Sequence, residues 1–492
     1  MKTIRISDLD NVAVALHPIA EGEEITAGGI TVKALMDIPQ GHKIALLPIK
    51  KGENVVKYGF PIGHATEDAA PGTWMHTHNV KTNLEGEMEY TYTPSLTFPE
   101  KVEPETFQGF RRKDGRAAIR NEIWIIPTVG CVNDVVKKMV RDNQDLVTGT
   151  IDGLYTFPHP FGCSQTGEDH AQTRKLLAAL VRHPNAAAVL VLGLGCENLT
   201  HEQFLEELGD YDKDRVKFLI CQEAGDEFSE GRELLKQCAE YASQFKREPI
   251  PVSELVIGMK CGGSDGLSGI TANPAVGRFS DMMAARGGST VLTEVPEMFG
   301  AEGFLMNRCV NEAVFEKAVD MINGFKNYFI SHNEVVYDNP SPGNRQGGIT
   351  TLEDKSCGCV QKGGTAPIMD VIGYGDPVVT KGLNMLYGPG NDLVSATAMT
   401  AAGAHMILFT TGRGTPFGAP APTLKLATNS QLAEKKKGWI DFDAGPIADG
   451  ESIDDAAKRL LQLVIETADG KQTKAEEKGF REISIFKDGV VL

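Results

Sequence analysis

The sequence predicts an α/β protein in which a small all-β domain precedes two α/β domains with mainly parallel sheets. Three observations lead to this prediction. Short apolar stretches separated by turn residues fill roughly the first hundred residues. Buried-strand patterns then alternate with helix patterns, as in sheets built from β–α–β units. A proline-containing segment near residue 250 interrupts this alternation, which afterwards starts again. The expected limits are an all-β domain at 1–98, a linker at 99–108, and α/β domains at 109–248 and 249–492.

The all-β domain is predicted from regularly spaced turn signals. Glycines that end short turn motifs recur at intervals of roughly eight to twelve residues, which is typical of small β-rich domains. These glycines are Gly22, Gly29, Gly41, Gly52, Gly59 and Gly72. The domain ends near the segment that carries His76 and His78, and the prolines Pro94, Pro99 and Pro104 then indicate a linker.

The first α/β domain is predicted from three apolar strands and the helices between them. The strands are expected at 121–128, 187–192 and 216–221. The helices are expected at 132–140, 168–181 and 229–246. Strands that alternate with helices in this way form a parallel sheet.

The second α/β domain shows the same alternation of predicted strands and helices after the boundary at Lys246–Pro251. Its strands are expected at 254–259, 289–293, 383–387 and 405–409. Its helices are expected at 274–286, 313–327, 392–402 and 453–468.

Composition and charge argue against several classes of function for this protein. Of 492 residues, 41% are hydrophobic and 23% charged, which is ordinary for a globular enzyme. The net charge of −17 argues against nucleic acid as a partner. The longest clear apolar run, 186–194, is about half of what spans a bilayer, so no membrane partner is expected. The first ten residues lack the apolar core of a signal peptide, and the nine cysteines are therefore expected to be thiols of a cytoplasmic protein.

A glycine-rich loop follows the strand at 254–259 and is the clearest candidate binding site. It runs from Cys261 to Pro274 and leads into a predicted helix. Glycines allow backbone N–H groups to approach an anion closely at such a strand-to-helix turn. The side chains expected to add directional hydrogen bonds to a carboxylate or polyol are Ser264, Asp265, Ser268 and Asn273.

Glycine–cysteine steps recur along the chain and suggest a metal site. Cys131, Cys163, Cys196 and Cys359 each follow a glycine, and Cys261 comes just after the predicted strand at 254–259. Thiolates at the carboxyl edge of a sheet can bind iron or another transition metal. Alternatively each cysteine is a small buried apolar residue. Glu197 directly follows Cys196 and is a further candidate metal ligand, with helix capping as the alternative.

Histidines and cations supply the remaining candidates. His76 and His78 are two residues apart, so on a strand both rings face one side and can bind a metal or act as a base. The alternative is a pair of surface histidines at a turn. His170 stands just before or within a predicted helix and is a second candidate acid or base. Arg413, in a glycine-flanked turn, suits a carboxylate, and Lys355 is a weaker candidate for the same role.

Several long strings resemble the altronate/galactarate dehydratase family. They include Lys57–Gly63, Pro127–Asn133, Gly193–Asn198, Cys261–Pro274, Thr293–Glu302, Gly347–Ser356 and Thr411–Pro416. The resemblance extends over nearly the whole chain and implies that residues 1–98 form a β-clip domain of the SAF type. It also implies a divalent metal, Fe²⁺ first and Mn²⁺ second, and no organic cofactor.

The implied reaction is the loss of water from C2–C3 of D-altronate to give 2-dehydro-3-deoxy-D-gluconate, in hexuronate catabolism. The implied metal ligands are His76, His78, Cys163, Cys196 and Glu197, and the implied catalytic residues are His76, His78 and His170. The substrate contacts are then Ser264, Asp265, Ser268, Asn273, Lys355 and Arg413. Three alternatives stay open: a dehydratase of galactarate or another sugar acid, an iron–sulfur enzyme that uses Cys131, Cys163, Cys196 or Cys261, and a non-catalytic sugar-acid-binding protein. A homo-oligomer is also expected.

Overall fold

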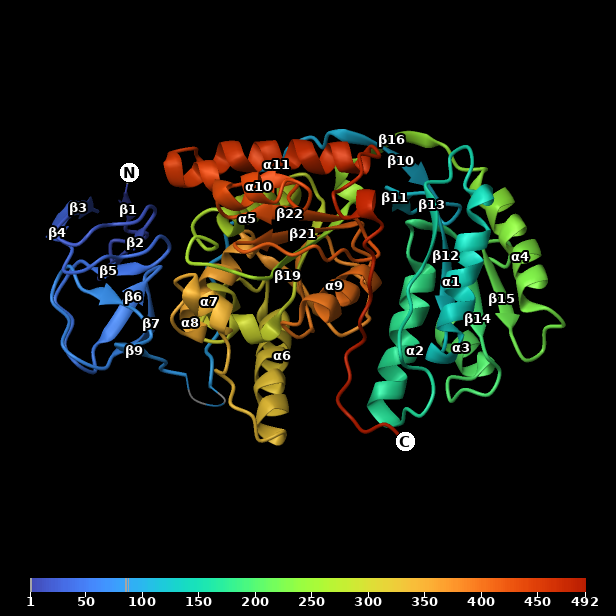
Figure 1. Ribbon diagram of the computed structural model, residues 1–492, viewed down its shortest axis with the longest axis horizontal. Helices are drawn as coiled ribbons and strands as arrows, with labels where there is room; N and C mark the ends of the chain where they lie inside the picture. The colour runs from blue at the N-terminus through green and yellow to red at the C-terminus, as the bar shows by residue number, and fades with distance from the viewer. Residues whose placement is uncertain (1, 85, 87) are drawn as a thin grey trace.

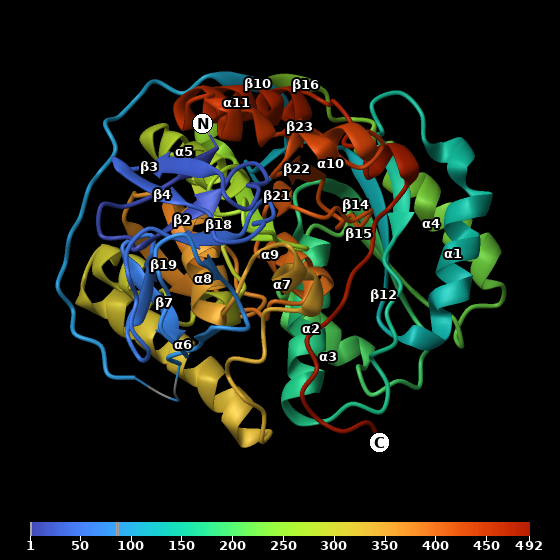
Figure 2. The ribbon, with the colours of Figure 1, turned by 60° about the vertical axis from the view of Figure 1, so that its left-hand side comes forward.

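The computed structural model describes residues 2–84, 86 and 88–492 and arranges them in three bodies. Figure 1 shows a β-rich N-terminal body, a central body formed by the last part of the chain, and a second α/β body on the far side. The C-terminal domain therefore lies between the two domains that precede it in sequence (Figures 1 and 2). Among the described residues, no helix combines the length and apolar character that a membrane span requires.

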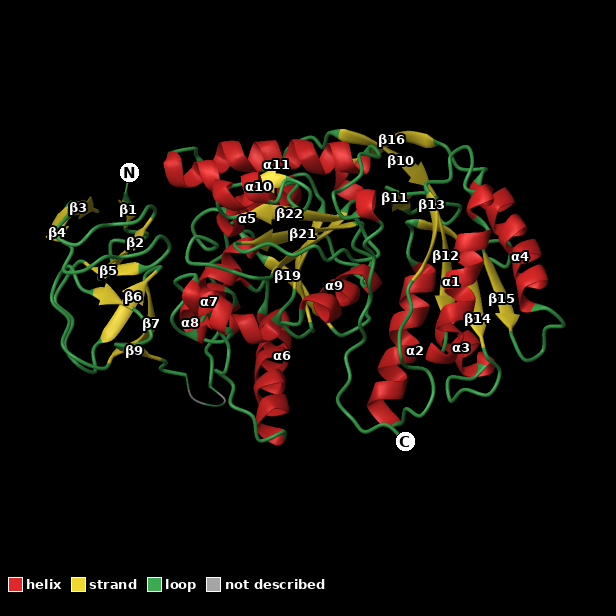
Figure 3. Cartoon of the chain, in the orientation of Figure 1, coloured by secondary structure: helices red, strands yellow, loops and turns green. Residues whose placement is uncertain are grey.

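The N-terminal body contains only strands and turns, as Figure 3 shows. Three small antiparallel sheets have the strand orders β1-β2-β5-β8, β3-β4 and β6-β7-β9. The strands are β1 Thr3–Ile4, β2 Val12–Ala15, β3 Glu24–Ala27, β4 Ile30–Lys33, β5 Lys43–Ala45, β6 Asn54–Lys57, β7 Phe60–Ala65, β8 Trp74–Met75 and β9 Val80–Lys81. The predicted all-β domain is confirmed, and the glycines that signalled its turns, Gly22, Gly29, Gly41, Gly52, Gly59 and Gly72, have positive φ.

The described residues between β9 and residue 106 form no helix or strand. Strand β10 (Thr106–Arg111) then pairs antiparallel with β11 (Ala117–Ala118) and with β16 (Arg247–Pro251). The last part of the expected linker, 106–108, is thus a strand. Because β10 and β16 stand at the two ends of the second domain, their pairing closes that domain on itself.

The second domain is a parallel four-stranded sheet of order β13-β12-β14-β15. Helices α1 and α4 pack on the face that carries Ile123, Ile125 and Leu190, and α2 packs on the face that carries Trp124 and Val189. Its elements are β12 Glu122–Pro127, α1 Asn133–Asp142, β13 Gly153–Thr156, α2 Gly167–Arg182, β14 Ala186–Gly193, α3 His201–Leu208, β15 Val216–Ile220 and α4 Glu227–Ala242.

The C-terminal domain has a parallel seven-stranded sheet of order β19-β20-β18-β17-β21-β22-β23. Helices α5 and α11 pack together against one side of it, and α9 contacts β17 and β21 from the other (Figure 1). The strands are β17 Val256–Cys261, β18 Ser289–Leu292, β19 Ile368–Ile372, β20 Gly382–Leu386, β21 Met406–Thr411, β22 Thr423–Ala427 and β23 Phe442–Asp443. The helices are α5 Ala272–Ala285, α6 Glu312–Ser331, α7 Pro342–Gln346, α8 Leu352–Cys359, α9 Asp392–Ala401, α10 Ser430–Lys435 and α11 Ile453–Ala468.

The second and third domains share a core and a C-terminal tail. One continuous apolar cluster includes Trp124 and Leu177 of the second domain and Met259 of the third. The tail runs back across the second domain, where Arg481 forms two hydrogen bonds of 2.8 and 3.0 Å with the carboxylate of Glu122. The two domains are therefore joined by packing as well as by the chain.

Candidate functional site

The carboxyl edge of the seven-stranded sheet gathers ionisable side chains from four segments. Strand β17 lies between β18 and β21 and ends at Cys261. Beyond β18 lie Glu294, in the left-handed backbone region with φ 69°, and Glu297, in a short 3-10 helix. Helix α8 supplies Cys359, and the first residue of α9 is Asp392. This is the edge at which parallel α/β sheets bind their ligands.

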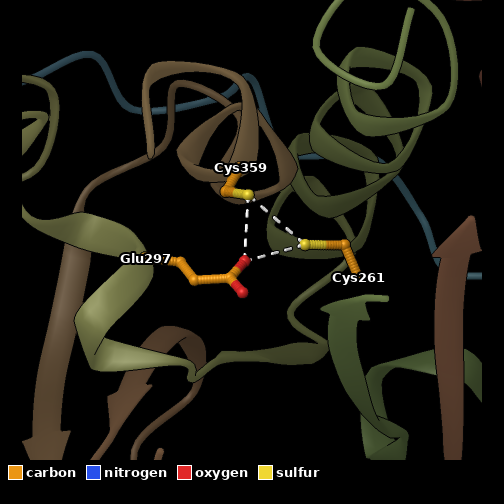
Figure 4. A group of neighbouring side chains, drawn as sticks. All are labelled: Cys261, Glu297 and Cys359. Carbon is orange, nitrogen blue, oxygen red and sulfur yellow. Dashed lines mark hydrogen bonds between the residues drawn. The ribbon is translucent and has the colours of Figure 1, made fainter. Parts of the chain in front are cut away.

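Two thiols and one carboxylate meet at the centre of this edge, as Figure 4 shows. The Sγ atoms of Cys261 and Cys359 are 3.3 Å apart, and each lies 3.1 Å from Oε2 of Glu297. All three residues are buried, and within the described part of the chain they form the only group of three potential ligand atoms closer than 4.8 Å to one another. Thiolate and carboxylate together suit iron, zinc or manganese better than they suit calcium or magnesium.

Three buried lysines surround this group. Lys355 Nζ is 2.8 Å from Glu297 Oε1, Lys362 Nζ is 3.1 Å from Glu294 Oε2, and Lys260 Nζ is 3.1 Å from Glu294 Oε1. Burial raises the pKa of Glu297, but Lys355 and Lys362 outweigh burial and bring this pKa to about 2. Burial by itself lowers the pKa of Lys355. Glu297 and the two thiols outweigh burial, so the pKa of Lys355 is raised above its ordinary value. The carboxylate and the ammonium groups are therefore both ionised at neutral pH.

The charges around the two thiols balance without a metal only while the thiols keep their protons. Lys260 also pairs with Asp392 at 2.6 Å, so three lysines face three carboxylates. The hydrogen bond with Cys261, followed by burial, raises the pKa of the Cys359 thiol well above its ordinary value. Ionisation of both thiols adds two negative charges, which a divalent cation would neutralise. The residues present therefore fit a divalent metal that exchanges for two thiol protons.

A cavity of about 630 Å³ opens onto this group. Cys261, Glu297, Lys355 and Asp392 line it, together with the loop glycines Gly262 and Gly263. Its polar wall continues through Asn339, Ser341, Asn344 and Asn391, and its apolar wall includes Phe325, Tyr328, Phe329 and Phe486. Its volume is within the range of small-molecule sites in proteins.

Three of the loop residues predicted to contact substrate have partners within the chain. Asp265 accepts hydrogen bonds from Leu267 N, Ser268 Oγ, Thr428 Oγ1 and Asn429 Nδ2. Asn273 donates to the carbonyl oxygen of Gly358 and accepts from Thr410 Oγ1 at 2.6 Å. These bonds hold the glycine-rich loop in place, with Asp265 as its anchor. Ser264 differs, because its hydroxyl is buried without a hydrogen-bond partner in the described chain and faces a small space that Lys355 also lines.

The two predicted cations differ in their surroundings. Lys355 is buried beside Glu297, as described above, and lines the large cavity. Arg413 is exposed, and its hydrogen bond from Nη1 to the carbonyl oxygen of Gly343 is long at 3.4 Å. Arg413 lines a second cavity of about 360 Å³ together with Gln40 of the N-terminal domain and Asp265.

The predicted histidines of the N-terminal domain lie next to the segment before α8. His76 is buried, its Nδ1 lies 3.5 Å from Thr350 Oγ1, and its ring stacks on Trp74 at 5.6 Å. Burial, followed by Lys43 and His42, lowers the pKa of His76 to about 3, so the ring is neutral near pH 7. His78 is exposed and lies 5.2 Å from the Trp74 ring.

The remaining predicted residues lie in the second domain. The three groups of proposed metal ligands, namely His76 with His78, Cys163 with Cys196, and Glu197, are not gathered with one another in the described structure. Glu197 instead accepts hydrogen bonds from Thr128 Oγ1 and from the N–H groups of Leu194 and Gly195, so its carboxylate stabilises its own loop. His170 lies in α2, where burial and Arg174 lower its pKa.

Sequence reasoning missed Glu294, Glu297 and Lys260 as site residues. Each stands at or just after a strand that proves to be central in the sheet, next to the loop that was singled out. The signal was present in the string Thr293–Glu302, where Glu294 and Glu297 closely follow a buried strand. What could not be inferred was that β18 lies beside β17, since the order of strands is a tertiary property.

Comparison with known proteins accounts for the whole chain. Three family models match: the altronate/galactarate dehydratase SAF domain at 1–83, the D-galactarate dehydratase/altronate hydrolase second domain at 109–243, and the D-galactarate/altronate dehydratase C-terminal domain at 252–491. The chain is 52% identical to an altronate dehydratase of Escherichia coli, with all of both chains covered. It is 53% identical to an altronate dehydratase of Bacillus subtilis over 99% of both chains. It is also 33% identical to an L-threo-forming galactarate dehydratase of Escherichia coli, over 99% of this chain and 97% of that one.

The three matched ranges coincide with the three bodies of the structure, and the candidate site lies in the third. The SAF-type N-terminal domain expected from the sequence is confirmed by both its sheets and its family match. The chain belongs to the D-galactarate/altronate dehydratase family.

Proposed function

We propose that this protein is a metal-dependent altronate dehydratase that converts D-altronate to 2-dehydro-3-deoxy-D-gluconate. Two relatives that carry the name altronate dehydratase match it at 52% and 53% identity over essentially their full lengths, whereas the galactarate dehydratase matches at 33%. This difference favours altronate over galactarate as the substrate. The sulfolactate sulfo-lyase β subunit of Chromohalobacter salexigens, 31% identical over 78% of this chain, is a more distant relative.

The observation that carries the proposal is the buried Cys261–Glu297–Cys359 group with its lysines, of which Cys261, Glu297 and Lys355 line a cavity of about 630 Å³. Removing a proton from the carbon next to a carboxylate builds negative charge on that carboxylate in the transition state. Fixed positive charge in a site shielded from water stabilises such a transition state strongly. Lys355 is the lysine of this cluster that also lines the cavity, so we assign to it the stabilisation of the substrate carboxylate.

Iron(II), with manganese(II) as the alternative, is the proposed metal, and Cys261, Glu297 and Cys359 would hold it. A divalent metal at this place supplies Lewis-acid stabilisation to the carboxylate and its neighbouring hydroxyl. The chain's own polar groups at the cavity wall, Asn339, Ser341 and Asn344, are suited to bind the remaining hydroxyl groups of a sugar acid. Proton transfer at C2 and C3 needs a base and an acid. His76, His78 and His170 stay the predicted candidates for these roles.

The test is a steady-state assay of the metal-loaded protein with D-altronate, galactarate and D-mannonate, with detection of the 2-keto product. We expect the highest kcat/KM for D-altronate. A clear preference for galactarate would contradict the substrate while leaving the dehydratase assignment intact. Binding of altronate without any keto product would instead identify a sugar-acid-binding protein.

A further inference from the structure

Three cysteines follow three neighbouring strands of the second domain. The strand order is β13-β12-β14, and Cys163, Cys131 and Cys196 come after these strands respectively. All three strands are parallel, so their carboxyl ends share one edge of the sheet. Pro127 and Leu192 are register partners, and Cys131 and Cys196 each come four residues after that pair. The cysteines of β12 and β14 therefore leave the sheet at the same level.

Hydrogen bonds tie the three cysteine loops together. Gly130 N donates to Phe161 O at 2.9 Å, which joins the loop of Cys131 to that of Cys163. Leu199 N donates to Gly162 O at 3.0 Å, and Ser164 N donates to Asn198 Oδ1 at 2.7 Å. These two bonds join the loop of Cys163 to that of Cys196. The Cys163 loop thus contacts both of the other loops.

The glycine before each cysteine is required by the close approach of these loops. A Cβ atom on Gly162 would lie 2.0 Å from Thr128 O, and one on Gly130 would lie 2.9 Å from His159 O. Gly195 has φ 121°, a conformation that residues with a side chain rarely adopt. The backbones are packed this tightly while the three thiols remain exposed to solvent. Packing therefore fixes the loops, and the sulfur atoms are left available to a ligand.

The surroundings of the thiols favour an electron-rich, anionic group. Each loop leads into a helix, α1, α2 or α3, and helix N-termini stabilise negative charge. Gln222 Nε2 donates to Cys196 Sγ at 3.3 Å. Gln165 is 3% exposed, and its Oε1 accepts from Gly162 N at 3.1 Å, which places its amide beside Cys163. The Nε2 of that amide is buried without a partner in the described chain, so one donor at this edge has no acceptor supplied by the protein.

The spacing of the thiols favours a cluster over a single ion. In the described chain, only Cys261, Glu297 and Cys359 bring three potential ligand atoms within 4.8 Å of one another, so the three exposed thiols are spread more widely. Thiolates ligate iron–sulfur clusters through separate irons and can therefore be farther apart than the ligands of one ion. We propose that Cys131, Cys163 and Cys196 ligate a four-iron, four-sulfide cluster, one iron of which receives no cysteine from this domain.

The chemistry of this site needs no further reactant besides the cluster. A preformed cluster enters, three thiol protons leave, and three sulfur–iron bonds form without a change of oxidation state. Cys221, which follows β15 at the same edge, is not assigned as a ligand, because it is only partly exposed whereas Cys131, Cys163 and Cys196 are exposed. The proposal goes beyond the proposed function, since the group at Cys261 lies in another domain.

The test is the iron and acid-labile sulfide content of the full-length protein, purified without oxygen and then reconstituted with iron and sulfide. We expect about four irons and four sulfides per chain at this site, with the broad visible absorption of an iron–sulfur cluster. Cys131→Ser, Cys163→Ser and Cys196→Ser should each lose most of the sulfide and this absorption. The matched control Cys221→Ser should keep both. Far-ultraviolet circular dichroism of each variant checks that the exposed substitutions leave the fold intact.

Two further variants separate this site from the one in the third domain. Cys261→Ser and Cys359→Ser should keep the full sulfide content, whatever their effect on the dehydration of altronate. Wild-type protein without sulfide after reconstitution, or a triple variant that retains the cluster, would overturn the proposal. Zinc or sulfide-free iron on the three thiols would overturn it as well. Failure of altronate turnover with the cluster present would instead count against the proposed function alone.

Discussion

Lys355 shows at the scale of one residue how burial and charge combine in the candidate site. It pairs with Glu297 at 2.8 Å, is 8% exposed and borders the cavity. Lys355→Met is expected to lower kcat/KM for the sugar acid by at least about 100-fold, because fixed charge at the developing oxyanion is lost. Steady-state kinetics on metal-loaded protein measure this.

Two matched variants complete the Lys355 experiment. Lys355→Arg should recover part of the kcat that Lys355→Met loses, because it restores the cation. If Lys355 were purely structural, these substitutions would change the stability of the protein but not kcat. Lys437 is exposed, so Lys437→Met should leave kcat and kcat/KM unchanged. Wild-type kcat/KM in Lys355→Met would remove this lysine from the site.

The close contact of Cys261, Glu297 and Cys359 leads us to expect that these residues bind the metal. Cys359→Ser and Glu297→Gln should each weaken iron binding at least about tenfold, because substitutions even one shell farther out typically cost that much. Equilibrium binding with a competing chelator measures the affinity, independently of activity. Cys357→Ala is the matched control, since Cys357 is a buried cysteine of the same helix that is outside the group. Equal affinities in Cys359→Ser and Cys357→Ala would show that the metal binds elsewhere.

Helix α8 connects the candidate site to the N-terminal domain. Asp354, one residue before Lys355, accepts hydrogen bonds from Lys43 Nζ at 2.8 Å and from Lys57 Nζ at 3.0 Å. All three side chains are buried. Burial alone raises the pKa of Asp354, but the two lysines hold it well below its usual range. The glycine-rich loop also touches this domain, since a Cβ on Gly266 would lie 1.9 Å from Gly41 O.

Asp354→Asn is therefore expected to destabilise the protein by about 3 kcal/mol or more, because it leaves two buried ammonium groups without their carboxylate. Urea unfolding measures the loss, and limited proteolysis after residue 88 should become faster as the N-terminal domain loosens. Asp68→Asn is the control, because its pair with Lys50 at 2.9 Å is exposed and surface pairs contribute at most about 1 kcal/mol. An unfolding free energy of Asp354→Asn equal to that of Asp68→Asn would contradict this role for α8.

The elements that sequence patterns predicted best were long and periodic. Strand β14 and helices α2, α6 and α11 lie within a few residues of their expected limits. Strands β19 and β22 were missed because a charged residue, Asp370 or Lys425, interrupts the short apolar run of each. Helix α8 was missed because a run of four polar residues, Glu353 to Ser356, leaves no apolar face in its 8 residues. The Cys261–Cys359 contact joins residues 98 positions apart, and no local pattern specifies such a pairing.

At the scale of the whole molecule, the junction between the two α/β domains depends on neutral histidines. His183 Nε2 lies 3.0 Å from Ala404 O across the junction, and His405 Nε2 lies 2.9 Å from Ala117 O in the opposite direction. His405 Nδ1 also accepts a hydrogen bond from Val256 N at 3.0 Å. Burial is the main cause that lowers the pKa of His183 to about 3 and that of His405 to about 4. Both rings are therefore uncharged when the domains are packed together.

Because both junction histidines are uncharged in the folded protein, we expect the free energy of unfolding to fall in mild acid. Because the folded-state pKa values lie below the unfolded value of about 6.5, the unfolded chain takes up protons first as the pH falls. The stabilisation is complete above about pH 6.5 and is lost between there and about pH 4, by about 3 kcal/mol for each histidine. Urea midpoints measured from pH 7 to pH 4.5 should fall accordingly, and His405→Gln should reduce the slope even if it lowers the midpoint at pH 7. His64→Gln, which alters a ring bonded to Asn83 in the N-terminal domain, should leave the slope unchanged. A slope in His405→Gln as steep as that of the wild type would show that acid destabilises the protein through other ionisable groups and not through this junction.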